Sequence, residues 1–209
     1  MTTDFQASLF DVQAGPALEG LGATVRRHPL SRGAWVDVRP GWLSGADDLF
    51  ARLVRDVPWK AERRQMYDAV VAVPRLLKFY DATEPLPDPV LELARDALSD
   101  HYADELGEPF TTAGFCYYRD GRDSVAWHGD RIGRSKTDDT MVAIVSLGEE
   151  RRLSLRPRGG GAGTGFSVGH GDLVVMGGSC QRTWEHAILK TARPVGPRIS
   201  IQFRPHDVR

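Results

Sequence analysis

His128 and Asp130 are separated by a single glycine in Trp127–His128–Gly129–Asp130, and both carry side chains that bind metal ions. On an extended backbone, residues two apart point to the same face. An imidazole and a carboxylate placed together are two of the three ligands of a non-haem iron(II) site with open coordination positions. The pair also occurs by chance, so the hypothesis depends on a third ligand elsewhere in the chain.

His186 is the best candidate for that ligand among the six histidines of the chain. It follows the apolar segment Leu173–Met176 and leads into Ala187–Ile188, so its imidazole is expected near the core end of a strand. In a jelly roll, the intervening strands can return the chain beside the first two ligands. The remaining histidines fall in loops, on a helix or near the C-terminus and are predicted to lie at the surface: His28, His101, His170 and His206.

The last predicted strand, Arg198–Arg204, alternates strictly between polar and apolar residues. Ile199, Ile201 and Phe203 share one face, and Arg198, Ser200, Gln202 and Arg204 share the other. A solvent-exposed sheet face would have this pattern. So would a cosubstrate pocket, because a guanidinium group can bind a terminal carboxylate through two hydrogen bonds.

Two helices and then a series of short strands are predicted to position these residues. Apolar residues at helical spacing predict a first helix over residues 44–57, and Asp88–Pro89 begins a second helix that ends near Gly107. From Phe110 onward, about seven short apolar segments are separated by turns. This order predicts an α+β fold that is mainly β, a jelly roll with two or so N-terminal helices on one side.

Composition limits the class of protein. The chain has 209 residues, which suits a single domain over residues 1–209, and its net charge is −1, so it lacks the overall basic field of many nucleic-acid binders. Two cysteines form no disulfide framework, and no apolar run is long enough for a membrane helix. We therefore expect a cytoplasmic protein without membrane contact.

Several stretches of this chain resemble a known family. His128–Gly129–Asp130 followed by His186 and Arg198 resembles the H-x-D…H…R arrangement of 2-oxoglutarate-dependent iron dioxygenases. The closing stretch Arg198–Arg204 is similar to the terminal R-x-N-x-T-x-R of the AlkB family, and Pro74–Arg75 and the turn Tyr118–Gly121 also look like that family. The resemblance extends roughly over residues 59–205 and implies a double-stranded β-helix whose core spans residues 110–205.

The resemblance implies a role for each matching residue. His128, Asp130 and His186 would bind iron(II). Arg198 would hold the far carboxylate of 2-oxoglutarate with the help of Tyr118, and Arg204 would lie near Asp130 and the metal-binding end of the cosubstrate. Dioxygen completes the set of cofactors.

Residues expected around the substrate follow from the same resemblance. Arg64, Met66 and Tyr67 fall in a segment, residues 59–80, where the family carries a nucleotide-recognition lid. Trp127 and Trp184 flank metal ligands and are expected to line the pocket, although both would also suit a plain apolar core. Basic residues form a candidate patch for phosphate groups, with a solvated polar face as the alternative: Arg131, Arg134, Lys136 and the run Arg151–Arg158.

The implied activity is oxidative demethylation of N-alkylated bases, DNA more than RNA, by a monomeric repair enzyme. Three departures from the family pattern concern the cosubstrate and the substrate. Cys116 and Ser200 replace asparagines that would contact 2-oxoglutarate, and the acidic residue often found just after H-x-D is absent, since Arg131 and Ile132 follow Asp130. Two alternatives stay open: a hydroxylase that acts on a protein or small molecule, and a non-catalytic β-helix module that retains a metal.

Overall fold

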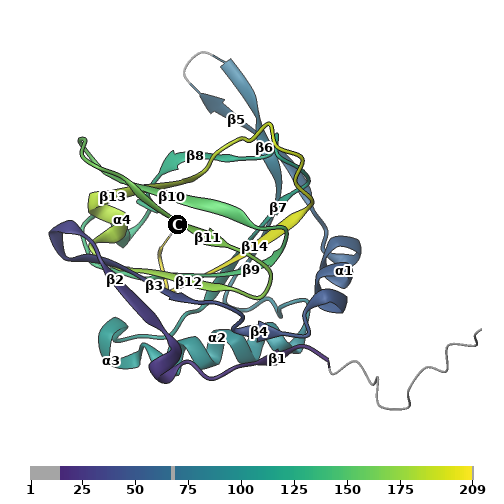
Figure 1. Ribbon diagram of the computed structural model, residues 1–209, viewed down its shortest axis with the longest axis horizontal. Helices are drawn as coiled ribbons and strands as arrows, with labels where there is room; N and C mark the ends of the chain where they lie inside the picture. Colours follow the sequence, from purple (N-terminus) through teal and green to yellow (C-terminus); the bar gives the residue numbers. More distant parts are fainter. Residues whose placement is uncertain (1–14, 67–68, 209) are drawn as a thin grey trace, which may run out of the picture.

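The computed structural model describes residues 15–66 and 69–208 and shows a mainly β protein with its two longest helices on one side (Figure 1). Its larger sheet has the strand order β2-β3-β12-β9-β14-β7-β6-β5, and neighbouring strands run antiparallel. The bounds of these strands are β2 (Arg26–Pro29), β3 (Ala34–Arg39), β5 (Lys60–Met66), β6 (Ala69–Tyr80), β7 (Thr112–Tyr118), β9 (Val142–Gly148), β12 (Leu173–Gly178) and β14 (Arg198–Arg204).

The smaller sheet contains the other strands of the jelly roll, in the order β11-β10-β13-β8. Its strands are β8 (Val125–His128), β10 (Arg151–Pro157), β11 (Thr164–Val168) and β13 (Trp184–Ile188). A separate short pair joins β1 (Ala17–Leu18) to β4 (Leu43–Ser44). Strand β8 forms one edge of the smaller sheet, so one side of this strand has no strand partner in that sheet.

Two apolar clusters hold the layers together. One lies between the two sheets and includes Ile144 and Val174 from the larger sheet and Leu153 and Ile188 from the smaller one. The other lies between the larger sheet and the helices, where Ile201 is fully buried. Side chains along a strand point alternately to its two faces. A strand packed on both faces therefore contributes to both clusters, and a strand with one exposed face contributes to one cluster and to the surface. This architecture confirms the predicted jelly roll with helices on one side.

The helices are α1 (Asp47–Asp56), α2 (Pro89–His101), α3 (Ala103–Leu106) and α4 (Cys180–Thr183), with short 3-10 turns at Gly22–Thr24, Ser31–Gly33 and Arg134–Lys136. As predicted, Asp88 caps α2, because its carboxylate accepts a hydrogen bond from the backbone N–H of Val90, and Pro89 takes the first helical position. Leu91 and Leu98 on the buried face of α2 pack into the helix-side cluster.

Two predicted helix ends differ from the structure. Helix α1 begins at Asp47 and not at Ser44, because Ser44 pairs with Ala17 in the short strand β4. Gly107 ends the separate turn α3, with a φ of 74°, whereas α2 ends before Tyr102. None of the helices in the described ranges is long and apolar enough to cross a membrane.

Candidate metal centre and adjoining cavity

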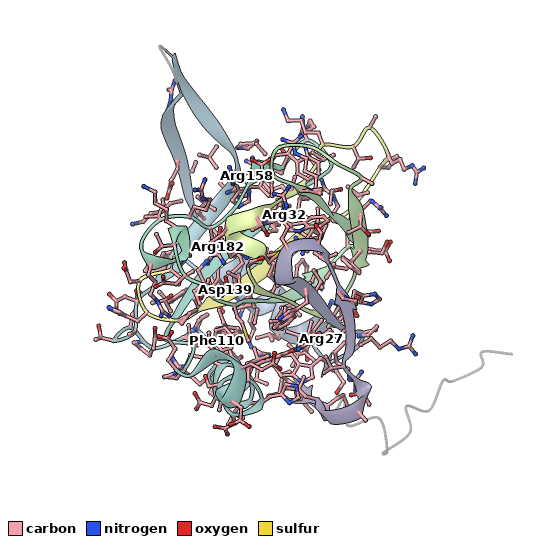
Figure 2. The ribbon with its side chains drawn as sticks, turned by 90° about the vertical axis from the view of Figure 1, so that its left-hand side faces the viewer. Arg27, Arg32, Phe110, Asp139, Arg158 and Arg182 are labelled. Atoms are coloured by element: carbon pink, nitrogen blue, oxygen red, sulfur yellow. The ribbon has the colours of Figure 1, made fainter. Side chains whose placement is uncertain are left out.

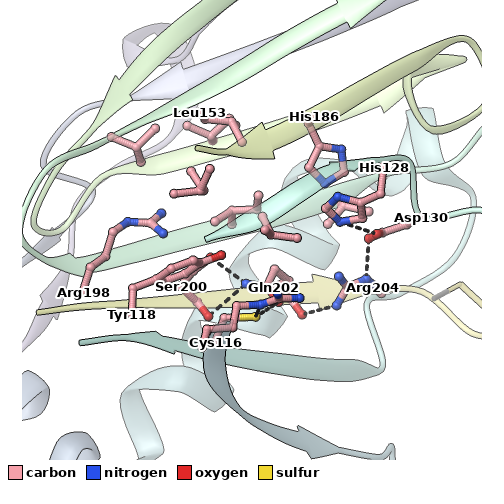
Figure 3. Close-up of a pocket in the computed structure, with 17 residues that line it drawn as sticks. Cys116, Tyr118, His128, Asp130, Leu153, His186, Arg198, Ser200, Gln202 and Arg204 are labelled. Atoms are coloured by element: carbon pink, nitrogen blue, oxygen red, sulfur yellow. Dashed lines mark hydrogen bonds and ion pairs between the residues drawn. The ribbon is translucent and has the colours of Figure 1, made fainter. Parts of the chain in front are cut away.

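Strands β8 and β13 bring together the three predicted metal ligands. His128 ends β8 and pairs directly with His186 on β13, and their ring centroids lie 4.2 Å apart. Asp130 follows two residues after His128. The potential ligand atoms of the three side chains all lie within 4.8 Å of one another. Figure 3 shows the three side chains together at one end of the pocket. Two imidazoles and one carboxylate are the donor set of an iron(II) facial triad.

Gly129 allows the chain to turn from His128 to Asp130. A Cβ atom at this position would lie 2.5 Å from the carbonyl oxygen of Gln181 and 3.2 Å from that of Trp184. Gln181 also accepts a hydrogen bond on Oε1 from the backbone N–H of Asp130, at 3.0 Å. The segment just before β13 therefore fixes the position of Asp130. Because this segment leads directly to His186, it positions Asp130 and His186 relative to each other.

The charges of the site favour a metal-binding protonation state. Asp130 is buried, and its Oδ2 accepts a hydrogen bond from Nε of Arg204 at 2.8 Å. Burial alone would raise the pKa of Asp130, but opposing charges, of which Arg204 contributes most, lower it below its usual range. Burial, together with the charge of His128, lowers the pKa of His186 to about 3. The carboxylate is thus charged and the His186 imidazole neutral, as metal binding requires.

His128 is oriented by its own strand. Its Nδ1 lies 2.8 Å from the carbonyl oxygen of Ala126, and its Nε2 lies 3.6 Å from Oδ1 of Asp130. When Nδ1–H donates to that carbonyl, Nε2 presents its lone pair toward the carboxylate and toward a shared metal ion.

The polar face of β14 lines a closed cavity beside the triad, which rules out a solvent-exposed sheet face. Ser200 is 3% exposed and Arg198 is 2% exposed, and both line the cavity with the three predicted ligands. Ile199, Ile201 and Phe203 on the opposite face pack toward the helices. The cavity offers about 70 Å³ to the centres of water-sized spheres, several times the roughly 10–15 Å³ that one water molecule needs, so it can hold a small molecule.

Arg198 lies at the deep end of this cavity. Its Nε donates a hydrogen bond to Oγ of Ser146 at 2.9 Å, and its guanidinium carbon lies 5.4 Å from the centre of the Tyr118 ring. Its Nη1 is buried and has no hydrogen-bond partner among the described residues. Burial lowers the pKa of Arg198 and raises that of Tyr118. A buried cation with an unsatisfied N–H group is costly, and an anionic ligand would satisfy it.

The middle of the cavity contains two residues that replace the expected asparagines, and both have partners within the protein. Nε2 of Gln202 donates to the carbonyl oxygen and to Oγ of Ser200, at 3.0 and 2.6 Å. The thiol of Cys116 donates to Oε1 of Gln202 at 3.6 Å and accepts from Nε of Arg75 at 3.4 Å. Sequence reasoning assigned no role to Gln202, Arg75 or Ser146, although the alternation of β14 placed Gln202 on the correct face.

The two tryptophans do not line this cavity, which corrects the expectation from the sequence. Trp184 is buried in the cluster between the sheets, and its indole N–H donates to the carbonyl oxygen of Ser31 at 3.2 Å. Trp127 points to the other face of β8, where the guanidinium carbon of Arg156 lies 4.3 Å from its ring centre. A strand turns consecutive side chains to opposite faces, so the residue next to His128 is directed away from the cavity.

An open groove adjoins the cavity and reaches the triad from outside. Cys116, His128 and Asp130 border both spaces, while Phe79 on β6 and Ile132 after Asp130 border only the groove. Both are unusually exposed for large apolar side chains, at 39% and 68%. A substrate that reaches the triad would contact these two side chains.

The predicted lid forms the hairpin β5–β6, which extends the larger sheet beyond β7 and projects from the body of the protein (Figure 1). Arg64 and Met66 lie on β5, and the structure describes their strand but not their side chains. Tyr67 lies outside the described residues.

Comparison with known proteins gives the family. The model of the 2OG-Fe(II) oxygenase superfamily matches residues 75–204, a range that contains the triad and all of β14. The chain belongs to this superfamily. This family agrees with the expectation of a dioxygenase that uses iron(II), 2-oxoglutarate and dioxygen, and the donor set described above fits such a metal.

Similar proteins within the superfamily confirm the resemblance to AlkB. The alkB homolog 3 dioxygenase of Bos taurus is 30% identical over 190 residues, covering 79% of this chain and 64% of its own length. The human DNA oxidative demethylase ALKBH2 is 27% identical over 182 residues, covering 76% of this chain and 68% of its own. The chain thus spans just under two thirds of the alkB homolog 3 sequence.

Solved structures show the same fold. The structure of OsALKBH1 has a TM-score of 0.61 at 14% identity and covers 87% of this chain and all of its own. A 2OG-Fe(II) oxygenase from Burkholderia pseudomallei has a TM-score of 0.58 at 14% identity and covers 83% of this chain and 86% of its own.

Proposed function

We propose that this oxygenase removes alkyl groups oxidatively from N-alkylated bases in nucleic acid, as a DNA repair enzyme. The observation that carries the proposal is a single cavity that joins the His128–Asp130–His186 triad to a buried arginine, Arg198, with an unpartnered N–H group. The similar proteins named DNA oxidative demethylase ALKBH2 support nucleic acid as the substrate.

The triad residues would hold the iron(II) ion. Asp130 would supply one carboxylate oxygen, and its other oxygen stays with Arg204, which keeps the carboxylate oriented and charged. His128 and His186 would supply neutral imidazole nitrogens from paired strands. Three protein ligands leave coordination positions open for the cosubstrate and dioxygen.

Arg198 would bind the distal carboxylate of 2-oxoglutarate. Its Nη1 needs an acceptor, and its Nε is fixed by Ser146, so the guanidinium is oriented before the ligand enters. Tyr118 borders the same end of the cavity and would donate its hydroxyl to that carboxylate. Cys116 and Ser200 would lie beside the carbon chain of the ligand, and Gln202 would hold both side chains in place through its hydrogen bonds to them.

When bound, iron(II) and 2-oxoglutarate activate dioxygen and hydroxylate a C–H bond of the substrate, while 2-oxoglutarate is decarboxylated to succinate. An N-hydroxymethyl base then loses formaldehyde, and the original base is restored. The groove would bring the N-alkyl group to the triad. The cavity would exclude bulk water, because Arg198, Ser200 and His186 are each at most 8% exposed. A base within a duplex must be flipped out to enter this groove.

We further propose that the enzyme acts as a monomer in the cytoplasm and prefers DNA to RNA. The two cysteines are buried and free, which suits a reducing compartment. The preference for DNA is supported by the similar ALKBH2 proteins, which are named DNA oxidative demethylases.

One observation favours a second candidate, hydroxylation of a protein or small molecule. The groove is lined by Arg75, Lys78 and Arg204 against Glu62 and Asp130, and the residues directly after Asp130, from Arg131 to Thr137, include no acidic residue. A cationic methylated base gains less from such a groove than a neutral or anionic substrate does.

The test is release of formaldehyde by protein loaded anaerobically with iron(II) and then supplied with 2-oxoglutarate and air. Methylated single-stranded DNA, double-stranded DNA and RNA are compared at equal concentration. We expect release from DNA above that from RNA. Release from none of the three, together with decarboxylation of 2-oxoglutarate, would reject the proposal in favour of the hydroxylase.

A further inference from the structure

The outward face of the smaller sheet carries residues that neither the cavity nor the groove uses. On β10, Leu153 and Leu155 turn inward to the cluster between the sheets, and Arg152 and Arg156 turn outward and are exposed. Arg151, in contrast, is buried and donates to the carbonyl oxygens of Asp120, Asp123 and Leu189. Only part of the basic run Arg151–Arg158 is therefore available to a ligand.

Trp127 forms an aromatic surface on this face. Strand β13 separates Trp127 on β8 from Arg156 on β10, so the Arg156 side chain reaches across β13 to place its guanidinium carbon 4.3 Å from the ring centre. Arg156 also donates from Nε to Glu185 at 2.9 Å. Its side chain is still 47% exposed. A guanidinium plane over an indole is a cation–π contact that keeps both groups flat against the sheet.

Arg152 lies flat on the same face. A Cβ atom at Gly165 on β11 would be 2.8 Å from Nε of Arg152 and 2.9 Å from its Cζ, so this glycine leaves room for the guanidinium. Arg152 is exposed and has no ion-pair partner among the residues that the structure describes.

Further arginines continue this basic surface past the end of β10. Arg158 shares the carboxylate of Glu185, and Arg32 donates to the carbonyl oxygen of Arg158 at 3.2 Å. Figure 2 shows Arg158, Arg32 and Arg182 following one another on one side of the molecule. We call Trp127, Arg152, Arg156 and Arg158 the outer platform. Its three arginines exceed the one carboxylate, Glu185, that contacts them.

The outer platform is next to the metal centre. Trp127 precedes His128 directly in the chain, so their Cα atoms are about 3.8 Å apart. Strand β8 is the free edge of the smaller sheet, and His128 and Gly129 at its end border the groove. A chain-like ligand with one unit in the groove can therefore pass around β8 and place its next units on the platform.

We propose that the outer platform binds the nucleotides that flank the target base, as part of a single-stranded nucleic acid that passes around β8. Bases stack on aromatic and guanidinium planes, and the half-buried indole of Trp127 supports the exposed guanidinium plane of Arg156. Arginines also bind phosphate oxygens through paired N–H groups, so one surface serves both parts of a nucleotide. The proposal rests on the proposed function, because it takes nucleic acid as the substrate.

The test is fluorescence anisotropy of the full chain with unmodified single-stranded DNA. A labelled oligonucleotide of about 15 nucleotides, the upper range of single-strand sites, is compared with a trinucleotide over a series of salt concentrations. The variants are Trp127→Leu and the double variant Arg152→Gln with Arg156→Gln. Arg26→Gln is the matched control, since Arg26 is an exposed strand arginine on the larger sheet.

Trp127→Leu should weaken binding of the longer oligonucleotide about 5- to 150-fold, the range for loss of one stacked base. The double arginine variant should reduce the slope of log affinity against log salt by about 1.4, since two phosphate contacts are lost from a single strand. Binding of the trinucleotide and the behaviour of Arg26→Gln should match the wild type.

Wild-type affinity and slope in both variants would overturn the platform. Because the DNA is unmodified and binding is measured, this outcome is independent of formaldehyde release. Absence of release from every methylated nucleic acid would reject the proposed function, whereas retained release with unchanged binding in the variants would reject the platform alone. Arg152 and Arg156 are both exposed, so the double variant gives a readout even where Trp127→Leu lowers stability.

Discussion

Replacing Arg198 by methionine separates the cost of a buried cation from its use in binding. In the absence of ligand, the guanidinium is 2% exposed and leaves Nη1 without a partner. Exchange of buried charged groups for apolar side chains of similar volume is commonly neutral or stabilises by about 1–4 kcal/mol. We therefore expect the ligand-free Arg198→Met variant to unfold at or above the temperature of the wild type.

The same variant should lose its response to 2-oxoglutarate. Removing one partner of a buried charged hydrogen-bonded pair costs about 2–5 kcal/mol, which corresponds to a dissociation constant about 30- to 4,000-fold higher. At a ligand concentration that is about 100 times the wild-type dissociation constant, binding raises the free energy of unfolding of the wild type by about 2.7 kcal/mol and that of the variant by much less.

Thermal unfolding with Mn(II) and increasing 2-oxoglutarate measures both effects in one experiment. Arg193→Met is the control, because Arg193 is an exposed arginine outside the cavity. Equal ligand-induced shifts in wild type and Arg198→Met would refute the assignment of Arg198 to the cosubstrate. A ligand-free variant that unfolds several degrees below the wild type would show that Arg198 serves the fold instead.

Three other changes test the triad. His128→Ala should lower Mn(II) affinity, measured by calorimetry, by at least about 100-fold. The variant should keep the fold, because this imidazole is 37% exposed. It is a cleaner test than Asp130→Ala, which would also leave Arg204 without its carboxylate partner. Gly129→Ala should lower the free energy of unfolding in urea by about 1–3 kcal/mol and weaken Mn(II) binding, because the new Cβ would lie 2.5 Å from a backbone oxygen. Gly20→Ala is the control and should change neither quantity, because no atom lies within 4 Å of a Cβ at that position. The free energy of unfolding of the metal-free wild type should fall by about 2 kcal/mol when the pH is lowered from about 7.5 to about 5, because His186 is protonated in the unfolded chain and not in the folded one. His186→Gln should not show this decrease.

The metal centre and the polar face of β14 could be predicted because their signals are local. The spacing of His128 and Asp130 and the alternation of Arg198–Arg204 depend on backbone period alone. The cap of α2 is likewise local, since Asp88 and Pro89 act on the adjacent turn. His186 could be proposed as a ligand, but its pairing with His128 on β13 depends on sheet topology that no short stretch contains.

Contacts between distant segments could not be predicted. The fit of Gly129 against Gln181 depends on how α4 approaches the end of β8, and nothing in either stretch specifies that approach. Trp127 and Trp184 were assigned to the pocket because they flank ligands in the chain. Trp127, however, is adjacent to the inward-facing His128 on a strand, so its side chain points outward, toward Arg156. Trp184 is held away from the cavity by a hydrogen bond from its indole N–H to the carbonyl oxygen of Ser31.

The basic run Arg151–Arg158 shows the same limit. Its alternation predicted exposed arginines, and Arg152 and Arg156 are exposed. Arg151 is buried where three carbonyl oxygens from two loops, those of Asp120 and Asp123 in one and of Leu189 in the other, meet at its guanidinium group. Sequence spacing contains no information about such a meeting point.

The coupling of two products in one reaction tests the proposed dealkylation most directly. Succinate and formaldehyde are measured together, with iron(II), 2-oxoglutarate and a methylated single-stranded oligonucleotide, in wild type and in His128→Ala. We predict equal amounts of the two products in the wild type and neither above background in the variant. Succinate without formaldehyde in the wild type, or formaldehyde at the wild-type rate in His128→Ala, would contradict the assignment of this cavity to oxidative dealkylation of nucleic acid.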